Sequence, residues 1–333
     1  MKIGTHDIDE KILIVAEIGN NHEGNFDTAR RMVEAAADSG VDAVKFQTFQ
    51  TQLFTSNADP ARFERLKKFE LTQAQFIELS QLARSRGLIW FSTPLDLVSA
   101  RFLEPLVDVF KIASGDNDFL HLIAQVAATS KPLIISTGLA DLAHLEWISS
   151  FAREAGAEGH LAFLHCVCAY PAPATEANLR AIPMLAAELG VPIGWSDHTL
   201  GPRASLAAAA IGARIIEKHF TLDKNFSAFR DHQLSADPAE MRAIVEGVRE
   251  IEVLLGRAEK DVQPSEQGNA VPARRSIAAA RDLEKGYRLK DGDLMWVRPA
   301  IGLSPGQEEK LLGKALARAV KMGEAILEKD VEG

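Results

Sequence analysis

Cysteine and tyrosine are both scarce in this chain, with two of each among 333 residues. Cys166 and Cys168 lie too close together to staple a small secreted scaffold, so a disulfide-based fold is excluded. No apolar run reaches the length of a membrane-spanning helix, and the first residues lack the basic and apolar stretch of a signal peptide. We therefore expect no membrane partner and a reducing, cytoplasmic compartment.

Positive charge is also in deficit, because 37 lysines and arginines face 46 acidic residues, for a net charge of −9. This balance argues against nucleic acid or an anionic membrane as the main partner. A protein this acidic that binds an anion must use a few well-placed cations. Lysines inside apolar runs, Lys45 and Lys111 above all, are therefore candidates for anion binding.

Eight short apolar runs alternate with segments of helical periodicity, which predicts an α/β fold with a parallel sheet. Eight such repeats favour a closed (β/α)₈ TIM barrel over residues 1–256. The expected strands are Ile12–Ile18, Ala43–Phe49, Leu88–Ser92, Val109–Ile112, Leu133–Ser136, Leu161–His165, Pro192–Trp195 and Arg214–Phe220. The expected helices include Thr28–Ser39, Thr72–Arg86, Leu142–Ala155, Leu179–Leu189, Arg203–Ile211 and Pro238–Leu255.

The character of the chain changes after Gly256. Residues 257–272 are polar and contain Pro264 and Gly268, which predicts a linker. Residues 273–333 no longer alternate strand with helix and are expected to form a small, mostly β domain. The short strands expected there are Ser276–Ala280, Met295–Arg298, Ala315–Val320 and Ala325–Leu327.

Polar residues recur where the eight predicted strands end, which is where a TIM barrel carries its active site. They are Glu17, Lys45, Gln47, Thr93, Lys111, Ser114, Ser136, Thr137, Cys166, Cys168, Tyr170, His198, Glu217 and His219. The two lysines with Ser114, Ser136 and Thr137 suit a phosphate and carboxylate site. The alternative for each lysine is an ion pair with a carboxylate of a neighbouring strand.

His198 and His219 stand 21 residues apart at two successive strand ends, the pattern of a two-histidine divalent metal site. Alone, each histidine is more often structural. Strand alternation places Glu217 and His219 on one face and turns Lys218 toward the helices. We also expect Asp96 and Asp116 to cap helices and His165 to be structural.

Taken together, seven of these runs resemble the sialic acid synthase family. They are Ala16–Gly24, Ala43–Thr48, Phe91–Pro94, Lys111–Gly115, Ser136–Gly138, Ser196–Thr199 and Glu217–Thr221. The tail, from Arg274 through Pro299, resembles that family's C-terminal antifreeze-like (SAF, β-clip) domain. The resemblance covers nearly the whole chain, and its motifs occur in order.

The resemblance implies a reaction in which phosphoenolpyruvate condenses with an N-acylated aminohexose, giving a nonulosonic acid and phosphate. His198 and His219 would hold Mn or Mg, and Glu217 and Glu17 would be catalytic. The expected phosphoenolpyruvate ligands are Lys45, Thr93, Lys111, Ser114, Ser136 and Ser196. The expected sugar ligands are Glu17, Gln47, Tyr170, Asp231 and Arg298, the last reaching the site from the partner of a domain-swapped homodimer.

Two departures from the family pattern concern substrate binding. Cys168 stands where many members have Asn or Ser, so one phosphoenolpyruvate contact is in doubt, because sulfur is a poorer hydrogen-bond partner. Phe229 and Arg230 replace a Gly-Pro pair before Asp231. They put plain N-acetylmannosamine in doubt and suggest another acylated or dideoxy sugar.

Four readings remain open from the sequence. Within the family, the chain is a sialic acid synthase or a legionaminate, pseudaminate or surface-polysaccharide synthase. Outside it, a Schiff-base aldolase would use Lys45 or Lys111 without metal. A non-catalytic carbohydrate-binding protein would leave the polar strand ends unexplained.

Overall fold

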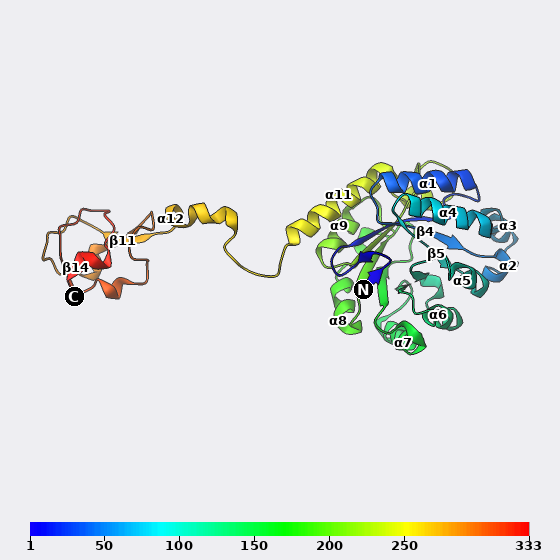
Figure 1. Ribbon diagram of the computed structural model, residues 1–333, viewed down its shortest axis with the longest axis horizontal. Helices are drawn as coiled ribbons and strands as arrows, with labels where there is room; N and C mark the ends of the chain where they lie inside the picture. Colours follow the sequence, from blue (N-terminus) through cyan, green and yellow to red (C-terminus); the bar gives the residue numbers. More distant parts are fainter. Residues whose placement is uncertain (333) are drawn as a thin grey trace. The chain divides into compact units, whose positions relative to one another are not determined.

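A computed structural model describes residues 1–332, which divide into two compact units, Met1–Gly256 and a second unit that begins at Arg257. In the first unit, helices surround a ring of parallel strands (Figure 1). Its main sheet has the order β5-β4-β3-β10-β9-β8-β7-β6. The end strands β5 and β6 lie side by side, which closes a (β/α)₈ barrel as predicted.

The barrel strands match the predicted runs to within one or two residues at each end. They are β3 (Leu13–Gly19), β4 (Ala43–Thr48), β5 (Ile89–Pro94), β6 (Phe110–Ile112), β7 (Leu133–Ser136), β8 (Leu161–Cys166), β9 (Ile193–Asp197) and β10 (Ile215–His219). A short hairpin of β1 (Lys2–Ile3) and β2 (His6–Asp7) precedes them. Seven of the eight strands are buried along their entire length, as a parallel sheet covered by helices requires.

The helices of the first unit include every predicted one, and α11 has the predicted bounds. They are α1 (Phe26–Asp38), α2 (Thr51–Phe54), α3 (Pro60–Phe69), α4 (Gln73–Ser85), α5 (Leu97–Leu103), α6 (Leu120–Ala127), α7 (Leu142–Ala152), α8 (Ala181–Leu189), α9 (Arg203–Ala210), α10 (Asp231–Leu234) and α11 (Pro238–Leu255). The α2 and α3 helices are an insertion between β4 and α4. Residues of both inserted helices line a cavity at the candidate active site.

Side-chain caps begin several of these helices. Thr72 and Gln75 form a reciprocal capping box at α4. Asp237 caps α11, whose first residue is Pro238. Asp96 caps α5, as predicted, by accepting from the Ser99 backbone amide. The predicted cap at Asp116 is wrong, because that residue lies inside a 3₁₀ turn, Ser114–Asp116.

One glycine is required by the closeness of two barrel strands. A Cβ on Gly194 of β9 would lie 2.5 Å from the backbone oxygen of Ile215, the first residue of β10. No real Cβ occupies such a position, so any side chain there would push these strands apart. Gly194 thus allows the close approach of β9 and β10. His198 directly follows β9, and His219 is the last residue of β10.

The second unit has its own small core, formed by Ile277, Ala279, Leu283, Leu289, Leu294, Leu311, Leu316, Val320, Ile326 and Val331. Its elements are α12 (Ala270–Ala273), β11 (Ser276–Ala279), β12 (Leu294–Val297), β13 (Ala315–Leu316) and β14 (Val331–Glu332). The predicted strand at 325–327 is wrong, because only an isolated bridge from Ala325 to Ala278 forms there. Within the predicted linker, residues 264–269 form a 3₁₀ helix.

None of the helices within residues 1–332 is long and apolar enough to cross a bilayer.

Candidate active site

Two buried lysines form the centre of a polar cluster at the carboxyl ends of the barrel strands. Lys45 Nζ lies 2.9 Å from Glu17 Oε2 and 3.6 Å from Glu217 Oε2, and donates to Thr93 Oγ1 at 3.2 Å. Lys111 Nζ donates to Ser136 Oγ at 2.6 Å and lies 4.0 Å from Glu217 Oε1. Both expected functions of the lysines are therefore compatible with this arrangement. The carboxylates pair them, and an incoming anion would meet the same ammonium groups.

The two carboxylates of the cluster have opposite pKa shifts. Burial raises the pKa of Glu17 to about 7, although Lys45 opposes this shift. Burial also acts on Glu217, but Lys111, Lys45 and the hydroxyl of Ser196, which donates at 3.0 Å, together lower its pKa. Two neighbouring carboxyls with pKa values driven apart are the usual signature of separate acid and base roles.

The lysines also differ from each other. Burial disfavours the charged form of Lys45, but its ion pairs with Glu17 and Glu217 outweigh that cost and raise its pKa. Burial lowers the pKa of Lys111, and the more distant Glu217, 4.0 Å away, only partly compensates for this effect. Lys45 therefore holds its proton more tightly than Lys111 does, and an arriving anion would stabilise the charged form of Lys111.

His198 and His219 lie next to this cluster, with ring centroids 5.4 Å apart. His198 Nδ1 is 2.8 Å from the Val167 carbonyl oxygen, which can only accept, so this nitrogen carries the proton and Nε2 keeps its lone pair. His219 Nδ1 is buried without a hydrogen-bond partner among residues 1–332. Burial lowers the pKa of both rings, that of His219 strongly.

These observations fit a divalent cation. Ligation needs neutral imidazoles, and a ligating histidine usually donates its second nitrogen to a carbonyl or carboxylate, as His198 does. In the described part of the chain, no three His, Cys, Asp or Glu side chains converge as a metal-binding group. A metal bound by this pair of histidines would thus have two protein ligands, with water or substrate completing its coordination.

Cys168 lies where the resemblance places a phosphoenolpyruvate contact. A Cβ on Gly138 would clash with Cys168 Sγ and would lie 2.7 Å from Ser114 Oγ, so these three residues are packed closely together. The Gly138 amide donates to Ser114 Oγ at 3.1 Å. A hydrogen bond with Cys166 lowers the pKa of the Cys168 thiol to about 6. A thiolate here is an acceptor, and it would repel an anion where Asn or Ser could donate.

A cavity of about 1010 Å³ opens beside the histidines. Its polar lining includes Gln47, Tyr170, His219 and Asp231, three of which are predicted sugar ligands. Gln47 Nε2 donates to Glu17 Oε1 at 3.2 Å, which joins this cavity to the lysine cluster. Asp231 Oδ1 is buried and has no hydrogen-bond partner in the part of the chain that the structure describes. Arg230 Nε forms an ion pair with this oxygen at 3.4 Å, and the oxygen can still accept from a ligand hydroxyl or from water.

Aromatic rings and a cation border the same cavity. Tyr170 stacks on His198 with centroids 4.2 Å apart, and the Arg230 guanidinium lies over the Tyr170 ring at 4.8 Å. Phe229 packs edge-on against Phe69 of α3, with centroids 5.2 Å apart. With Phe54 and Leu66, these two phenylalanines give the cavity one apolar wall.

Comparison with known proteins assigns the chain to a family. The family model described as "NeuB family" matches residues 32–260, and the "SAF domain" model matches residues 274–332. The chain belongs to the NeuB family. The resemblance to sialic acid synthases and the predicted SAF domain are confirmed.

Three relatives of this NeuB-family chain are named for different products. It is 38% identical to the N,N'-diacetyllegionaminic acid synthase of Campylobacter jejuni, over 96% of this chain and all of the relative. It is 34% identical to a pseudaminic acid synthase of the same species, over 99% of each. A crystal structure of N-acetylneuraminic acid synthetase from Leptospira borgpetersenii superposes with a TM-score of 0.77 at 32% identity, covering 81% of this chain and 94% of that one.

Family membership confirms that the chain is an enzyme, a synthase of the nonulosonic acid type, and it rules out the non-catalytic carbohydrate-binding alternative. The three relatives carry different product names, so the comparisons leave the acceptor sugar open.

The NeuB-family site also contains residues that the sequence analysis missed. Arg62 and Arg65 of the α3 insertion line the cavity, as do Glu23 and Ser227. No feature of the α3 sequence predicted a role at the site, because its polar residues are typical of a solvent-exposed helix. Glu23 and His232 had a usable signal, because Glu23 lies within the Ala16–Gly24 run and His232 directly follows Asp231.

Several predicted directions are confirmed. Lys218 faces the helix layer, where its Nζ lies 3.2 Å from Asp197 Oδ2, and Asp197 in turn accepts from Ser205 of α9. His165 is structural, with Nε2 bonded to the Ala177 carbonyl at 2.9 Å and its ring on Trp195.

Arg298 is exposed and follows β12 in the second unit.

Proposed function

We propose that the protein condenses phosphoenolpyruvate with an N-acylated aminohexose, in the presence of Mn or Mg, to give a nonulosonic acid and phosphate. The observation that supports this most directly is the continuity of two sites. The lysine cluster adjoins the histidine pair through Glu217 and His219, and Gln47 connects it to the large cavity. An anionic donor and a sugar acceptor can thus meet beside one cation.

In this proposal Lys45 and Lys111, with Thr93, Ser114, Ser136 and Ser196, bind the phosphate and carboxylate of phosphoenolpyruvate. Each lysine exchanges a carboxylate partner for the substrate anion, which offsets the cost of its burial. Glu17, Gln47, Tyr170 and Asp231 meet the hydroxyls of the acceptor. The cation, held by His198 and His219, would polarise the aldehyde oxygen of the open-chain sugar as a Lewis acid.

The bond changes balance with one water. The new bond joins carbon 3 of phosphoenolpyruvate to the aldehyde carbon of the sugar, and the aldehyde oxygen gains a proton. Water adds to carbon 2, and the tetrahedral intermediate loses phosphate. Glu17 and Glu217 are the groups placed to move these protons, because their pKa values are shifted in opposite directions.

The reaction test is phosphate release from phosphoenolpyruvate over a panel of acylated aminohexoses, with Mn added or with chelator. The panel includes a phosphorylated sugar, because Arg62, Arg65 and Arg230 line the cavity. We expect metal-dependent release with one sugar class. Condensation of pyruvate with a sugar that persists in chelator, together with borohydride trapping of pyruvate on Lys45 or Lys111, would instead favour the Schiff-base reaction.

For the acceptor, we propose another acylated or dideoxy sugar in place of plain N-acetylmannosamine. The apolar wall of Phe54, Leu66, Phe69 and Phe229 suits a methyl group and leaves a hydroxyl without a partner. Phe229→Gly and Arg230→Ala are expected to shift the sugar preference. An unchanged order of preference in both variants would contradict this assignment.

The resemblance also supports a domain-swapped homodimer in which the partner's SAF domain supplies the arginine at position 298, and the cytoplasm remains the expected compartment. Arg298→Ala should then weaken acceptor binding while the protein remains a dimer by light scattering. A monomeric, fully active wild-type protein would contradict the exchange.

A further inference from the structure

The segment that carries Phe229, Arg230 and Asp231 is a loop held at its base by the barrel. The Thr221 amide donates to the Ala236 carbonyl at 3.0 Å, and the Ala236 amide donates to the His219 carbonyl at 2.7 Å. Between these points, residues 222–230 form no helix or strand. Side chains must therefore fix the position of this loop over the cavity.

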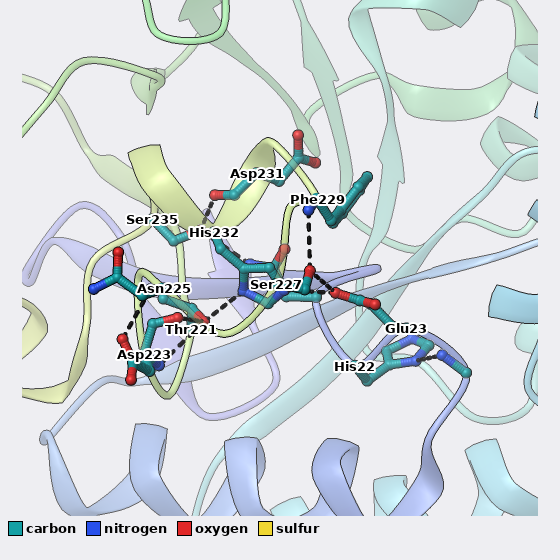
Figure 2. Close-up of polar contacts among 12 residues, drawn as sticks. His22, Glu23, Thr221, Asp223, Asn225, Ser227, Phe229, Asp231, His232 and Ser235 are labelled. Carbon is teal, nitrogen blue, oxygen red and sulfur yellow. Dashed lines mark hydrogen bonds and ion pairs between the residues drawn. The ribbon is translucent and has the colours of Figure 1, made fainter. Parts of the chain in front are cut away.

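Glu23 contacts the loop from outside, in addition to the ion pair of Lys224 with Glu240 and the packing of Phe229 on Phe69. It lies in the turn after β3, and its Oε1 accepts from the Ser227 hydroxyl and lies 3.0 Å from His232 Nε2. Ser227 Oγ in turn accepts from the Phe229 amide at 3.0 Å. Figure 2 shows this chain of contacts running from Glu23 through Ser227 to Phe229. One carboxylate oxygen thus connects both ends of the sugar-facing segment.

His232 is the second half of this arrangement, which we call the Glu23–His232 clasp. Its side chain is fully buried, with ring centroids 5.0 Å from Phe226 and 6.0 Å from Phe229. Its Nδ1 lies 2.7 Å from Thr221 Oγ1, so the ring ties the start of the loop to Glu23. If His232 lost either partner, one of its ring nitrogens would be buried without a hydrogen bond. That loss costs free energy, which favours this single arrangement of the side chains.

The turn after β3 also contacts the short helix that begins at Asp231. Asp231 is adjacent to His232 in the chain, and its backbone oxygen accepts from Ser235 Oγ at 2.6 Å. Ser235 Oγ accepts from Asn21 Nδ2 at 2.9 Å. Two residues of the turn after β3, Asn21 and Glu23, therefore hold the start of α10, which carries the Asp231 carboxyl that lines the cavity.

We propose that Glu23 and His232 are positioning residues that set acceptor selectivity, by holding Phe229 and Asp231 against the sugar. This inference rests on the proposed function for its kinetic meaning. It differs from a general structural role because none of the predicted ligands of phosphoenolpyruvate is part of the clasp. Loss of the clasp should therefore affect the acceptor and spare the donor.

The kinetic test compares Glu23→Ala, Glu23→Gln and His232→Gln in the full chain. Glu23→Ala removes a charged acceptor from both Ser227 and His232, so it should raise the acceptor KM about 10- to 100-fold. The phosphoenolpyruvate KM should change less than about twofold. Glu23→Gln keeps an oxygen that accepts from Ser227 and His232, so it should largely restore acceptor binding.

Lys224→Met is the matched control. Lys224 belongs to the same loop and pairs with Glu240 of α11 at 2.5 Å, but it does not line the cavity. Its loss should leave both KM values unchanged. Equal rises of the two KM values in Glu23→Ala, or an acceptor KM unchanged by Glu23→Ala, would overturn the proposal.

Hydrogen exchange provides a readout that does not need turnover. The Phe229 amide, bonded to Ser227 Oγ, should exchange faster in Glu23→Ala and His232→Gln than in the wild type, while amides of β4 stay protected. If the wild type releases no phosphate with any sugar, the proposed function fails. The exchange rate of the Phe229 amide then still tests whether Glu23 and His232 hold the loop. Unchanged exchange at Phe229 in both variants would refute it.

Discussion

Lys45 and Glu17 are directly paired neighbours on strands β4 and β3, and their charged atoms lie 2.9 Å apart inside the barrel. The same ammonium is 3.6 Å from Glu217, so one lysine is shared by two buried carboxyls. A single cation cannot fully stabilise two buried anions, and Glu17 is the one whose pKa rises, to about 7. This relationship makes protein stability depend on pH.

Glu17→Gln should make the protein relatively more stable as the pH rises. Between about pH 4.5 and 7 the folded Glu17 keeps a proton that the unfolded chain has lost, so the free energy of unfolding falls as pH rises through this window. Glutamine does not titrate, so the free energy of unfolding of the variant does not fall in this way. Urea midpoints at pH 5 and pH 8 measure the difference. Glu64→Gln, at an exposed position, is the control, and a difference that does not grow with pH would contradict the shift.

Lys218→Met should be among the most destabilising single changes in the barrel. It leaves Asp197, fully buried, without its cation, and breaking a buried ion pair from one side costs about 3–5 kcal/mol. Thermal and urea unfolding measure the loss. Lys321→Met removes the exposed pair with Asp282 and should have little effect. Similar losses in both variants would contradict this reading.

His198→Ala or His219→Ala should remove binding of Mn and abolish turnover. Loss of one of only two protein ligands should cost more than the ~10–100-fold in affinity that follows removal of a ligand's supporting partner. Calorimetry with Mn measures the binding directly, apart from activity. His144→Ala, on the surface helix α7, is the control. Wild-type affinity for Mn in both site variants would exclude this metal site.

Cys168 should react with iodoacetamide at pH 7 well ahead of Cys166, and phosphoenolpyruvate should slow the reaction. Hydrogen bonding lowers the Cys168 pKa to about 6, so most of this half-buried thiol is thiolate at pH 7. The pKa of buried Cys166 is raised instead. Peptide mass spectrometry after timed labelling measures both. Equal labelling, or no protection by phosphoenolpyruvate, would place Cys168 away from the donor.

Most of the barrel could be predicted from the sequence because its signals are local. Buried parallel strands read as short apolar runs, and caps such as Asp96 and the box of Thr72 and Gln75 mark helix starts. The polar strand ends could be predicted for the same reason: once the strands are known, the geometry of a barrel gathers their carboxyl ends. The 325–327 strand failed because an apolar triplet carries no information about pairing partners.

What the sequence alone determined is therefore the family, the fold and the set of inward-facing groups, Lys45, Lys111, Glu217 and the two histidines among them. Only the tertiary structure decided how these groups share charge, since burial and distances of 3–4 Å set which carboxyl is paired and which pKa rises. It alone also brought Glu23 to His232, 209 residues further along the chain. Contacts of that kind depend on where loops from different strands meet, and no local pattern encodes the meeting point.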